Sequence, residues 1–232
     1  MKIFYDVDTQ NDFMNKDGAL YVPDAELIKP NLKLITRCAF RNRTPVIGSV
    51  DRHFGTEEYK EREGELARWG GPFPDHCMDG TFGQKKIDET QIKRSDMMGI
   101  PPTEDAVYIP HRLDNKVNAP ELVRAAYENV LLELFEKKGV YFEKQSYDVF
   151  TNPSFEVFLD MAGVKEAVVY GVATDYCVKA AVLGMQERGI QCYVVEDAIK
   201  GVAPDTTKSA LEEMVKAEAE LITTKNILEG KI

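Results

Sequence analysis

The residue best placed to act as a nucleophile is Cys177, which comes shortly after an apolar, β-rich run at residues 167–171. Apolar residues at the helical offsets 0, 3, 4 and 7 come immediately after it: Val178, Ala181, Val182 and Met185. A thiol in the first turn of a helix meets the positive end of the helix dipole and free backbone N–H groups, which favour the thiolate and can bind an oxyanion. The pattern therefore predicts a reactive thiol, which needs a base and a substrate pocket beside it.

A base for this thiol is available in Asp8, just past the first predicted strand at residues 3–7. A carboxylate at a strand end could accept the thiol proton, although aspartates also favour turns and helix caps. Asp6 competes for this role, but it lies one strand alternation earlier and nearer the core. Lys144 ends another predicted strand, and between a carboxylate and a thiol it would stabilise the thiolate. A lysine at such a position is otherwise most often a solvated flank.

A candidate metal-binding pair, Asp51 and His53, follows the strand predicted at residues 45–50. Positions i and i+2 of an extended segment point the same way, so the carboxylate and the imidazole could share one ion. His76 could supply a third ligand, and three protein ligands with open positions describe a catalytic metal site. Asp-x-His alone is a weak signal, since surface salt bridging explains most such pairs. Cys77 is expected to be a packed thiol, because adjacent residues rarely bind one ion together.

Five glutamates lie between the two candidate histidine ligands: Glu57, Glu58, Glu61, Glu63 and Glu65. One of them could complete the coordination sphere of a metal, but we expect each to be solvated at the surface. The third histidine of the chain, His111, follows a proline in a predicted loop, and we assign it no role.

Apolar β-rich runs alternate with helical patterns, which is typical of a parallel α/β sheet. Strands are expected at residues 3–7, 45–50, 107–110, 140–142 (reaching Lys144), 167–171, 191–195 and 221–223. Helices are expected after Asp24, at 120–138, at 153–161, after Cys177 and at 205–217. The first helix should bury one face, made of Leu27, Ile28, Leu32, Ile35 and Ala39. Because ligands of open α/β sheets bind beyond the carboxyl ends of the strands, the polar residues at these ends should form one site.

The composition excludes several classes of function. A net charge of −10 argues against nucleic acid or an anionic membrane as the main partner. No apolar run is long enough to span a bilayer, and the acid at position 6 comes too early for a signal peptide, so we expect a cytoplasmic protein. The four cysteines lack Cys-x-x-Cys spacing, which argues against a zinc ribbon or a disulfide framework. Without repeats or a linker, residues 1–232 are predicted to form a single domain.

Five ordered segments resemble motifs of the isochorismatase-like cysteine hydrolases: residues 8–13, 51–53, 74–81, 144–150 and 171–177. The metal-ligand pattern is similar to that of the nicotinamidase (pyrazinamidase) branch. The resemblance covers most of the chain, except about residues 54–70 and 88–138. It implies a three-layer α/β sandwich around a central, mostly parallel sheet. It also implies hydrolysis of nicotinamide to nicotinate and ammonia through a cysteine thioester, a reaction of pyridine nucleotide (NAD) salvage.

The resemblance assigns roles to residues of this sequence. It implies a catalytic triad of Asp8, Lys144 and Cys177. It implies a divalent metal, usually Zn²⁺ with Fe²⁺ or Mn²⁺ as alternatives, held by Asp51, His53 and His76. It further implies a cis peptide before Ala173, with the amides of Ala173 and Cys177 as oxyanion hole. Phe13 and Phe73 match positions that hold the aromatic ring of the substrate, and most relatives have Trp where Phe73 stands.

The chain departs from the family pattern between His76 and Lys144, where an insertion at about residues 88–138 makes this region longer than usual. The segment from His53 to His76 lacks the extra histidine that some relatives have, and Gln145 replaces a frequent glycine. The substrate therefore stays open between nicotinamide and a carbamoyl or ureido compound. An isochorismatase-type vinyl-ether hydrolase and a non-catalytic metal- or ligand-binding protein are further alternatives. We expect a small-molecule amide as the main partner, and a homo-oligomer of undefined size.

Overall fold

The computed structural model describes residues 1–92, 106–111 and 139–232. Its strands form one seven-stranded sheet in the order β3-β4-β2-β1-β5-β6-β7, in which every neighbouring pair is parallel. The strands are β1 (Lys2–Val7), β2 (Val46–Asp51), β3 (Ala106–Ile109), β4 (Gly139–Lys144), β5 (Glu166–Val172), β6 (Gln191–Lys200) and β7 (Glu220–Ile222). The predicted parallel α/β sheet is therefore confirmed, with each strand near its expected place.

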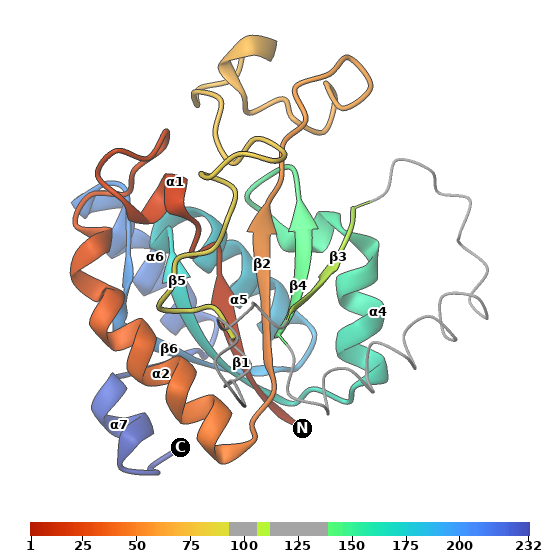
Figure 1. Cartoon of the computed structure of the whole chain (residues 1–232). Helices are drawn as coiled ribbons and strands as arrows, with labels where there is room; N and C mark the ends of the chain where they lie inside the picture. Colours follow the sequence, from red (N-terminus) through yellow and green to blue (C-terminus); the bar gives the residue numbers. More distant parts are fainter. Residues whose placement is uncertain (93–105, 112–138) are drawn as a thin grey trace, which may run out of the picture.

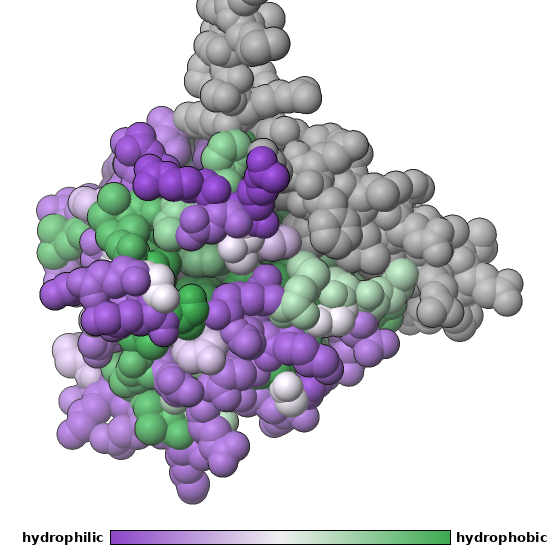
Figure 2. Space-filling view, turned by 90° about the horizontal axis from the view of Figure 1, so that it is seen from below, coloured by the Kyte–Doolittle hydropathy of each residue, from purple (hydrophilic) through white to green (hydrophobic). Residues whose placement is uncertain are grey.

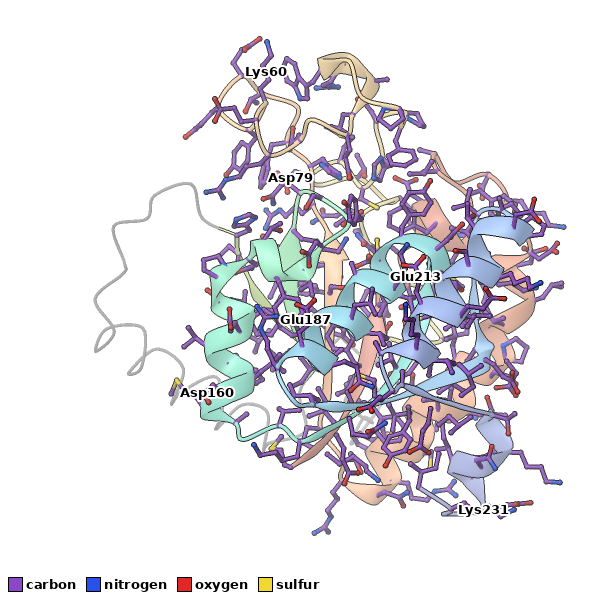
Figure 3. The ribbon with its side chains drawn as sticks, turned by 180° about the vertical axis from the view of Figure 1, so that it is seen from behind. Lys60, Asp79, Asp160, Glu187, Glu213 and Lys231 are labelled. Atoms are coloured by element: carbon purple, nitrogen blue, oxygen red, sulfur yellow. The ribbon has the colours of Figure 1, made fainter. Side chains whose placement is uncertain are left out.

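Helices cover both faces of the sheet, as Figures 1 and 3 show from opposite sides. One face carries α2 (Lys29–Asn42) and α7 (Thr224–Leu228), which contact each other. The other face carries α4 (Pro153–Met161), α5 (Lys179–Glu187) and α6 (Pro204–Lys216). In Figure 3 the labelled Glu187 and Glu213 mark α5 and α6 on this second face. The expected three-layer sandwich is confirmed.

The central strand β1 has a buried side chain on each face, because successive side chains of a strand point in opposite directions. Ile3 and Tyr5 belong to the core beneath α4, α5 and α6. Phe4 belongs to the core beneath α2 and α7. The strand is therefore apolar almost throughout, and its polar residues at positions 6 and 8 need partners inside the protein.

The helix expected after Asp24 consists of two elements, a 3₁₀ turn, η1 (Ala25–Ile28), followed by α2. Four of the five residues expected on its buried face are buried: Ile28, Leu32, Ile35 and Ala39. The prediction for Leu27 is wrong, since its side chain is 64% exposed. A 3₁₀ turn has three residues per turn instead of 3.6, so it turns Leu27 away from the face that α2 buries.

Local sequence explains how other helices begin. Pro153 stands at the first position of α4, and the Asn152 side chain caps it by accepting a hydrogen bond from the Ser154 amide. The short helix α7 was not expected, although Thr223 and Asn226 form a capping box at its start. Further short elements are α1 (Asn11–Met14), η2 (Ala67–Trp69), η4 (Val149–Thr151) and the π-helical turn η5 (Thr174–Val178).

The carboxyl ends of the strands lie at the upper edge in Figure 1, where the orange part of the segment after β2 rises above them, and the yellow part that follows runs down along the face of the sheet that carries α2. Lys60 and Asp79 label this segment in Figure 3. The helix expected at 120–138 lies outside the described residues. The described part of the insertion includes β3, which pairs with β4 and so belongs to the sheet itself. The single-domain organisation stays a prediction.

The face at the amino ends of the strands is seen from below in Figure 2, where hydrophilic and hydrophobic residues are interspersed. Such a mixture is ordinary for a protein surface. Within residues 1–92, 106–111 and 139–232, no helix has the length and apolar character needed to cross a membrane.

Candidate active site

Cys177 lies in η5, between the end of β5 and the start of α5. The four apolar residues that follow at helical spacing are buried, as predicted: Val178, Ala181, Val182 and Met185. The peptide bond between Val172 and Ala173 is cis, also as predicted. The thiol is 9% exposed, so it is accessible only through the cavity described below.

The structure brings Asp8, Lys144 and Cys177 together. The Lys144 Nζ lies 2.9 Å from Oδ2 of Asp8 and 3.6 Å from Sγ of Cys177. Asp8 follows β1, and Lys144 is the last residue of β4. Neither Asp8 nor Lys144 is exposed. The three side chains therefore form one buried cluster beyond the carboxyl ends of β4, β1 and β5.

Asp6 does not take part in this cluster. Its carboxylate is fully buried and lies 2.7 Å from the Nζ of Lys86, which also donates to the hydroxyl of Thr9. The Lys86 ammonium lies over the ring of Tyr141, 4.4 Å from its centroid. Asp6 and Lys86 thus form a separate buried ion pair that fastens the segment around residue 86 to β1.

Ser49 holds the candidate base in place, a role that the sequence did not suggest. Its hydroxyl donates a 2.8 Å hydrogen bond to Oδ1 of Asp8. The pairing of Ser49 with Val7 in the β1–β2 register places it there. With Oδ1 bonded to Ser49, the other carboxylate oxygen faces Lys144.

Burial controls the protonation of the cluster. It raises the pKa of Asp8 above its usual range, and it raises the pKa of the Cys177 thiol well above its usual range. Burial alone would lower the pKa of Lys144, but the carboxylates of Asp51 and Asp8 outweigh it and raise that pKa far above normal. Lys144 is therefore charged at neutral pH, and the thiol keeps its proton until a neighbouring group accepts it.

A second cluster lies beside the first. Asp51, His53, Glu65 and His76 each offer a ligand atom, and these atoms all lie within 4.8 Å of one another. Nε2 of His76 is 3.5 Å from Oδ2 of Asp51 and 3.7 Å from Oε1 of Glu65. Nε2 of His53 is 3.5 Å from the same Glu65 oxygen. The structure thus groups the three residues predicted as metal ligands and adds a fourth.

The expectation of surface solvation is wrong for Glu63 and Glu65. Glu63 is fully buried, and the Glu65 side chain is only 12% exposed. The chain folds back on itself here, because the Phe73 amide donates to the Glu65 carbonyl and the Ala67 amide donates to the Phe73 carbonyl. Burial raises the pKa of Glu65 to about 7. No local pattern distinguishes these two glutamates from the exposed Glu57, Glu58 and Glu61.

The donor set fits a divalent metal. Both ring nitrogens of His53 are buried without a hydrogen-bond partner among the described residues, which is unusual for a buried polar group. Lys144 contacts Oδ1 of Asp51, so that Oδ2 is left facing His76. Burial would raise the pKa of Asp51, but Lys144 and the histidines lower it below its usual range, which keeps a carboxylate ligand charged. Two imidazoles with two carboxylates suit Zn²⁺, Fe²⁺ or Mn²⁺.

Gln10 fixes the backbone of Asp51. Its Oε1 accepts from the Asp51 amide, and its Nε2 donates to the Asp51 carbonyl, both at 2.7 Å. The same Nε2 donates to the carbonyl of Gln84 in the overlying segment. A buried glutamine after β1 therefore joins three separate parts of the chain at the site, which sequence periodicity alone does not indicate.

A pocket opens onto both clusters, and its empty space is about 540 Å³ when the part open to solvent is included. It is lined by Phe13, Leu20, Tyr21, Val22, Asp51, Glu65, Phe73, His76, Tyr147, Val172, Ala173, Tyr176, Cys177 and Val202. The rings of Phe13 and Phe73 have centroids 5.4 Å and 6.4 Å from that of His76. The aromatic and aliphatic walls suit a planar ring, with the Cys177 thiol and the second cluster within its reach.

The predicted site residues all fall in or beside this cavity. Phe13, Phe73 and Ala173 line it, and Asp8 and Lys144 lie beside Cys177. Cys77 is a fully buried thiol away from the lining, as expected. His111 is 9% exposed, and its carbonyl accepts from Arg62.

Comparison with known proteins gives a family and several relatives. The family model described as the isochorismatase domain matches residues 103–226. The nicotinamidase of Escherichia coli is 30% identical over 231 residues, which cover 94% of this chain and 92% of that protein. The nicotinamidase/pyrazinamidase of Mycobacterium tuberculosis is 25% identical over 222 residues, covering 96% and 98%. The crystal structure of the pyrazinamidase of Pyrococcus horikoshii in complex with zinc has the same fold, with a TM-score of 0.68, 24% identity and coverage of 96% and 98%.

Proposed function

Because the chain belongs to the isochorismatase family, we propose that it is a nicotinamidase, an amidohydrolase that converts nicotinamide to nicotinate and ammonia. Two curated relatives that match nearly its whole length bear that activity in their names. One observation carries the proposal: the Asp8–Lys144–Cys177 cluster and a four-residue metal-binding cluster border the same ring-sized cavity.

The reaction begins with Cys177. Its thiol interacts with the Asp8 carboxylate, whose pKa is raised by burial and which is therefore a stronger base than an ordinary aspartate. As Asp8 takes the proton, the thiolate attacks the carboxamide carbon of the substrate. The Lys144 ammonium, 3.6 Å from the sulfur, stabilises the negative charge on sulfur during this step.

The negative charge then moves to the carboxamide oxygen. The backbone amides of Ala173 and Cys177 are the proposed oxyanion hole, and both residues line the cavity. Removing one such donor typically costs on the order of 3 kcal/mol of transition-state stabilisation.

Collapse of the tetrahedral intermediate breaks the C–N bond. Asp8 returns its proton to the departing nitrogen, ammonia leaves, and the acyl group stays on Cys177 as a thioester. In the second half, Asp8 removes a proton from an attacking water, and the acid product and the Cys177 thiol are regenerated. One residue thus alternates between base and acid.

Asp51, His53, Glu65 and His76 are the proposed ligands of a divalent metal. Such an ion would supply a positive charge that helps to orient the substrate ring and water. Zinc is the first candidate, since the Pyrococcus pyrazinamidase was crystallised with it, and Fe²⁺ or Mn²⁺ would suit the same donors. Phe13 and Phe73 both lie close to the ring of His76 and would hold the pyridine ring beside the cluster.

The decisive measurement is ammonia release from nicotinamide by the purified protein, with and without a chelator. We expect turnover that requires metal, and none with a Cys177→Ala variant. A panel with carbamoyl and ureido amides tests the neighbouring activities, and absence of hydrolysis throughout would indicate a binding protein.

The metal-binding cluster weighs against an isochorismatase-type hydrolase. The cytoplasmic location and the homo-oligomeric state stay predictions.

A further inference from the structure

Glu63 is a buried carboxylate that the proposed reaction does not use. Its side chain has no exposed surface, although it comes from a segment rich in exposed glutamates. Its Oε1 accepts from the Phe54 amide at 2.5 Å, and its Oε2 accepts from the Gly55 amide at 2.9 Å. A buried carboxylate carries a large desolvation cost, so its position beside the site calls for a role.

On the side of the site, this carboxylate faces the ring of His53. Oε1 of Glu63 lies 3.8 Å from Nδ1 of His53, and neither side chain is exposed. The other ring nitrogen, Nε2, faces Glu65 at 3.5 Å. Two glutamates separated by one residue therefore lie at opposite ends of one imidazole, one on the metal-binding side and one behind it.

The other histidine of the cluster is arranged in the same way. Nδ1 of His76 lies 2.8 Å from the carbonyl of Pro74, and its Nε2 faces Asp51 and Glu65. In both rings an acceptor stands behind Nδ1, and Nε2 is turned toward the shared carboxylates. A histidine binds a metal through the nitrogen that carries no proton, and the acceptor at the other nitrogen decides which one that is.

We propose that Glu63 is a positioning residue for His53, an inference that rests on the metal site of the proposed function. Glu63 holds the imidazole so that Nδ1–H points toward the Glu63 carboxylate. Nε2 of His53 is then free to bind the ion. The two backbone amides that hold Glu63 belong to the residues directly after His53, so ligand and acceptor are fixed to one short piece of chain. A carboxylate behind the imidazole also makes it a stronger ligand.

Metal affinity is the first test. Zn²⁺ binding to the Glu63→Gln variant is measured by competition with a chromophoric chelator, beside the wild type and Glu61→Gln, which makes the same charge change at an exposed position. We expect Glu63→Gln to bind about 10–100-fold more weakly, and Glu61→Gln to bind as the wild type does. Equal affinity of Glu63→Gln and wild type overturns the proposal.

The second test distinguishes positioning of the His53 ring by Glu63 from a role of Glu63 in the structure of the loop alone. Its first measurement is made on the wild type. The chain has three histidines, so ¹⁵N-histidine NMR of the zinc-loaded wild type resolves each ring, and His111→Gln assigns the ring outside the cluster. We expect His53 to carry its proton on Nδ1 and to exchange it slowly. In Glu63→Gln this proton should exchange at least about tenfold faster, since a neutral amide replaces the carboxylate that faces it, whereas that of His76 should not change.

A His53 protonated on Nε2 in the loaded wild type overturns the proposal even if Glu63→Gln fails to fold. So does an unchanged exchange rate in a folded variant. A wild type that binds no divalent ion removes the metal site and the role of Glu63 with it. A wild type that binds zinc but does not hydrolyse nicotinamide refutes the proposed activity alone. The role of Glu63 is then still decided by the metal-affinity and NMR measurements.

Discussion

The ammonium nitrogen of Lys144 lies 3.6 Å from the sulfur of Cys177, and both side chains are buried. Burial raises the pKa of the thiol, and the charge on Lys144 is the largest influence that opposes this rise. The nucleophile is therefore kept protonated in the resting protein but placed beside the one charge that would favour its ionisation. This balance makes Lys144 the first residue to test.

Replacing Lys144 with methionine keeps the length of the side chain and removes its charge. We expect the turnover of nicotinamide to fall by about 10²–10³-fold, because the developing thiolate loses its electrostatic partner. Steady-state ammonia release measures the effect, and circular dichroism checks that the variant is folded. Lys179→Met, on the surface of α5, is the control. Turnover within a few-fold of wild type would remove Lys144 from the mechanism.

Cys177→Ala should abolish hydrolysis while preserving the cavity. The thioester cannot form without sulfur, so the rate should fall by more than about 10⁴-fold, whereas nicotinate should still bind between Phe13 and Phe73. Calorimetric titration with nicotinate separates these two effects. Cys38→Ala, in α2 and outside the cavity, should behave as the wild type. Loss of activity in both variants would indicate general damage instead of loss of the nucleophile.

Metal removal should lower both activity and thermal stability. The four ligands come from the end of β2 and from the segment above it, so an ion would hold the two together, and a ligand that binds only the folded state stabilises it. We expect dialysis against a chelator to reduce the midpoint of thermal unfolding and to abolish ammonia release, with both restored by Zn²⁺, Fe²⁺ or Mn²⁺. An unchanged midpoint, with full activity in chelator, would argue against the site.

Removing one partner of the buried Asp6–Lys86 ion pair should strongly destabilise the folded protein. In Lys86→Met the Asp6 carboxylate is left in the core without its partner, and the free energy of unfolding should fall by about 3–5 kcal/mol. The double variant Asp6→Val/Lys86→Met removes both charges and should recover most of this loss. Urea unfolding measures both values. A double variant that is no more stable than Lys86→Met would contradict the cost assigned to the unpaired Asp6 carboxylate.

His111 should make the protein sensitive to acid. Burial lowers its pKa to about 4, whereas an unfolded chain takes up the proton near pH 6.5. The unfolded state thus binds more protons between these values, and stability falls as the pH drops from about 6.5 toward 4, by at most about 1.4 kcal/mol per pH unit. Urea unfolding of His111→Gln at pH 7 and pH 5 should show a smaller difference than the wild type. An equal difference would contradict the buried, neutral imidazole.

Much of this arrangement can be predicted from sequence, because the patterns that carry it are local. Strand ends locate Asp8, Asp51, Lys144 and Cys177, and parallel pairing brings them to one edge. The structure differs from the sequence prediction where contacts between segments, which no local pattern encodes, determine burial. Glu63 and Glu65 are buried because the segments just before and after them, around Gly55 and Phe73, fold against them. Leu27 is exposed because a 3₁₀ turn changes the helical phase.

The residues that brace the site were missed for the same reason. Ser49 lies in an apolar strand, and its bond to Asp8 depends on the β1–β2 register. Gln10 looks like an ordinary turn residue, yet its amide bonds the backbone of Asp51. Their roles follow from contacts between segments about forty residues apart, which spacing within one element does not encode.

The central place of β1 has a consequence for how the protein is made. In the sheet β1 lies between β2 and β5, so during synthesis one edge of the first strand waits for a partner until most of the chain has left the ribosome. An open apolar edge invites pairing with other chains, and contacts between distant segments form slowly. Asp8 is translated early and Cys177 late. A nascent chain that ends between them contains the base but not the nucleophile. The chain therefore has no nucleophile until Cys177 has been added, and the open edge of β1 is exposed to wrong pairing until β5 has been made.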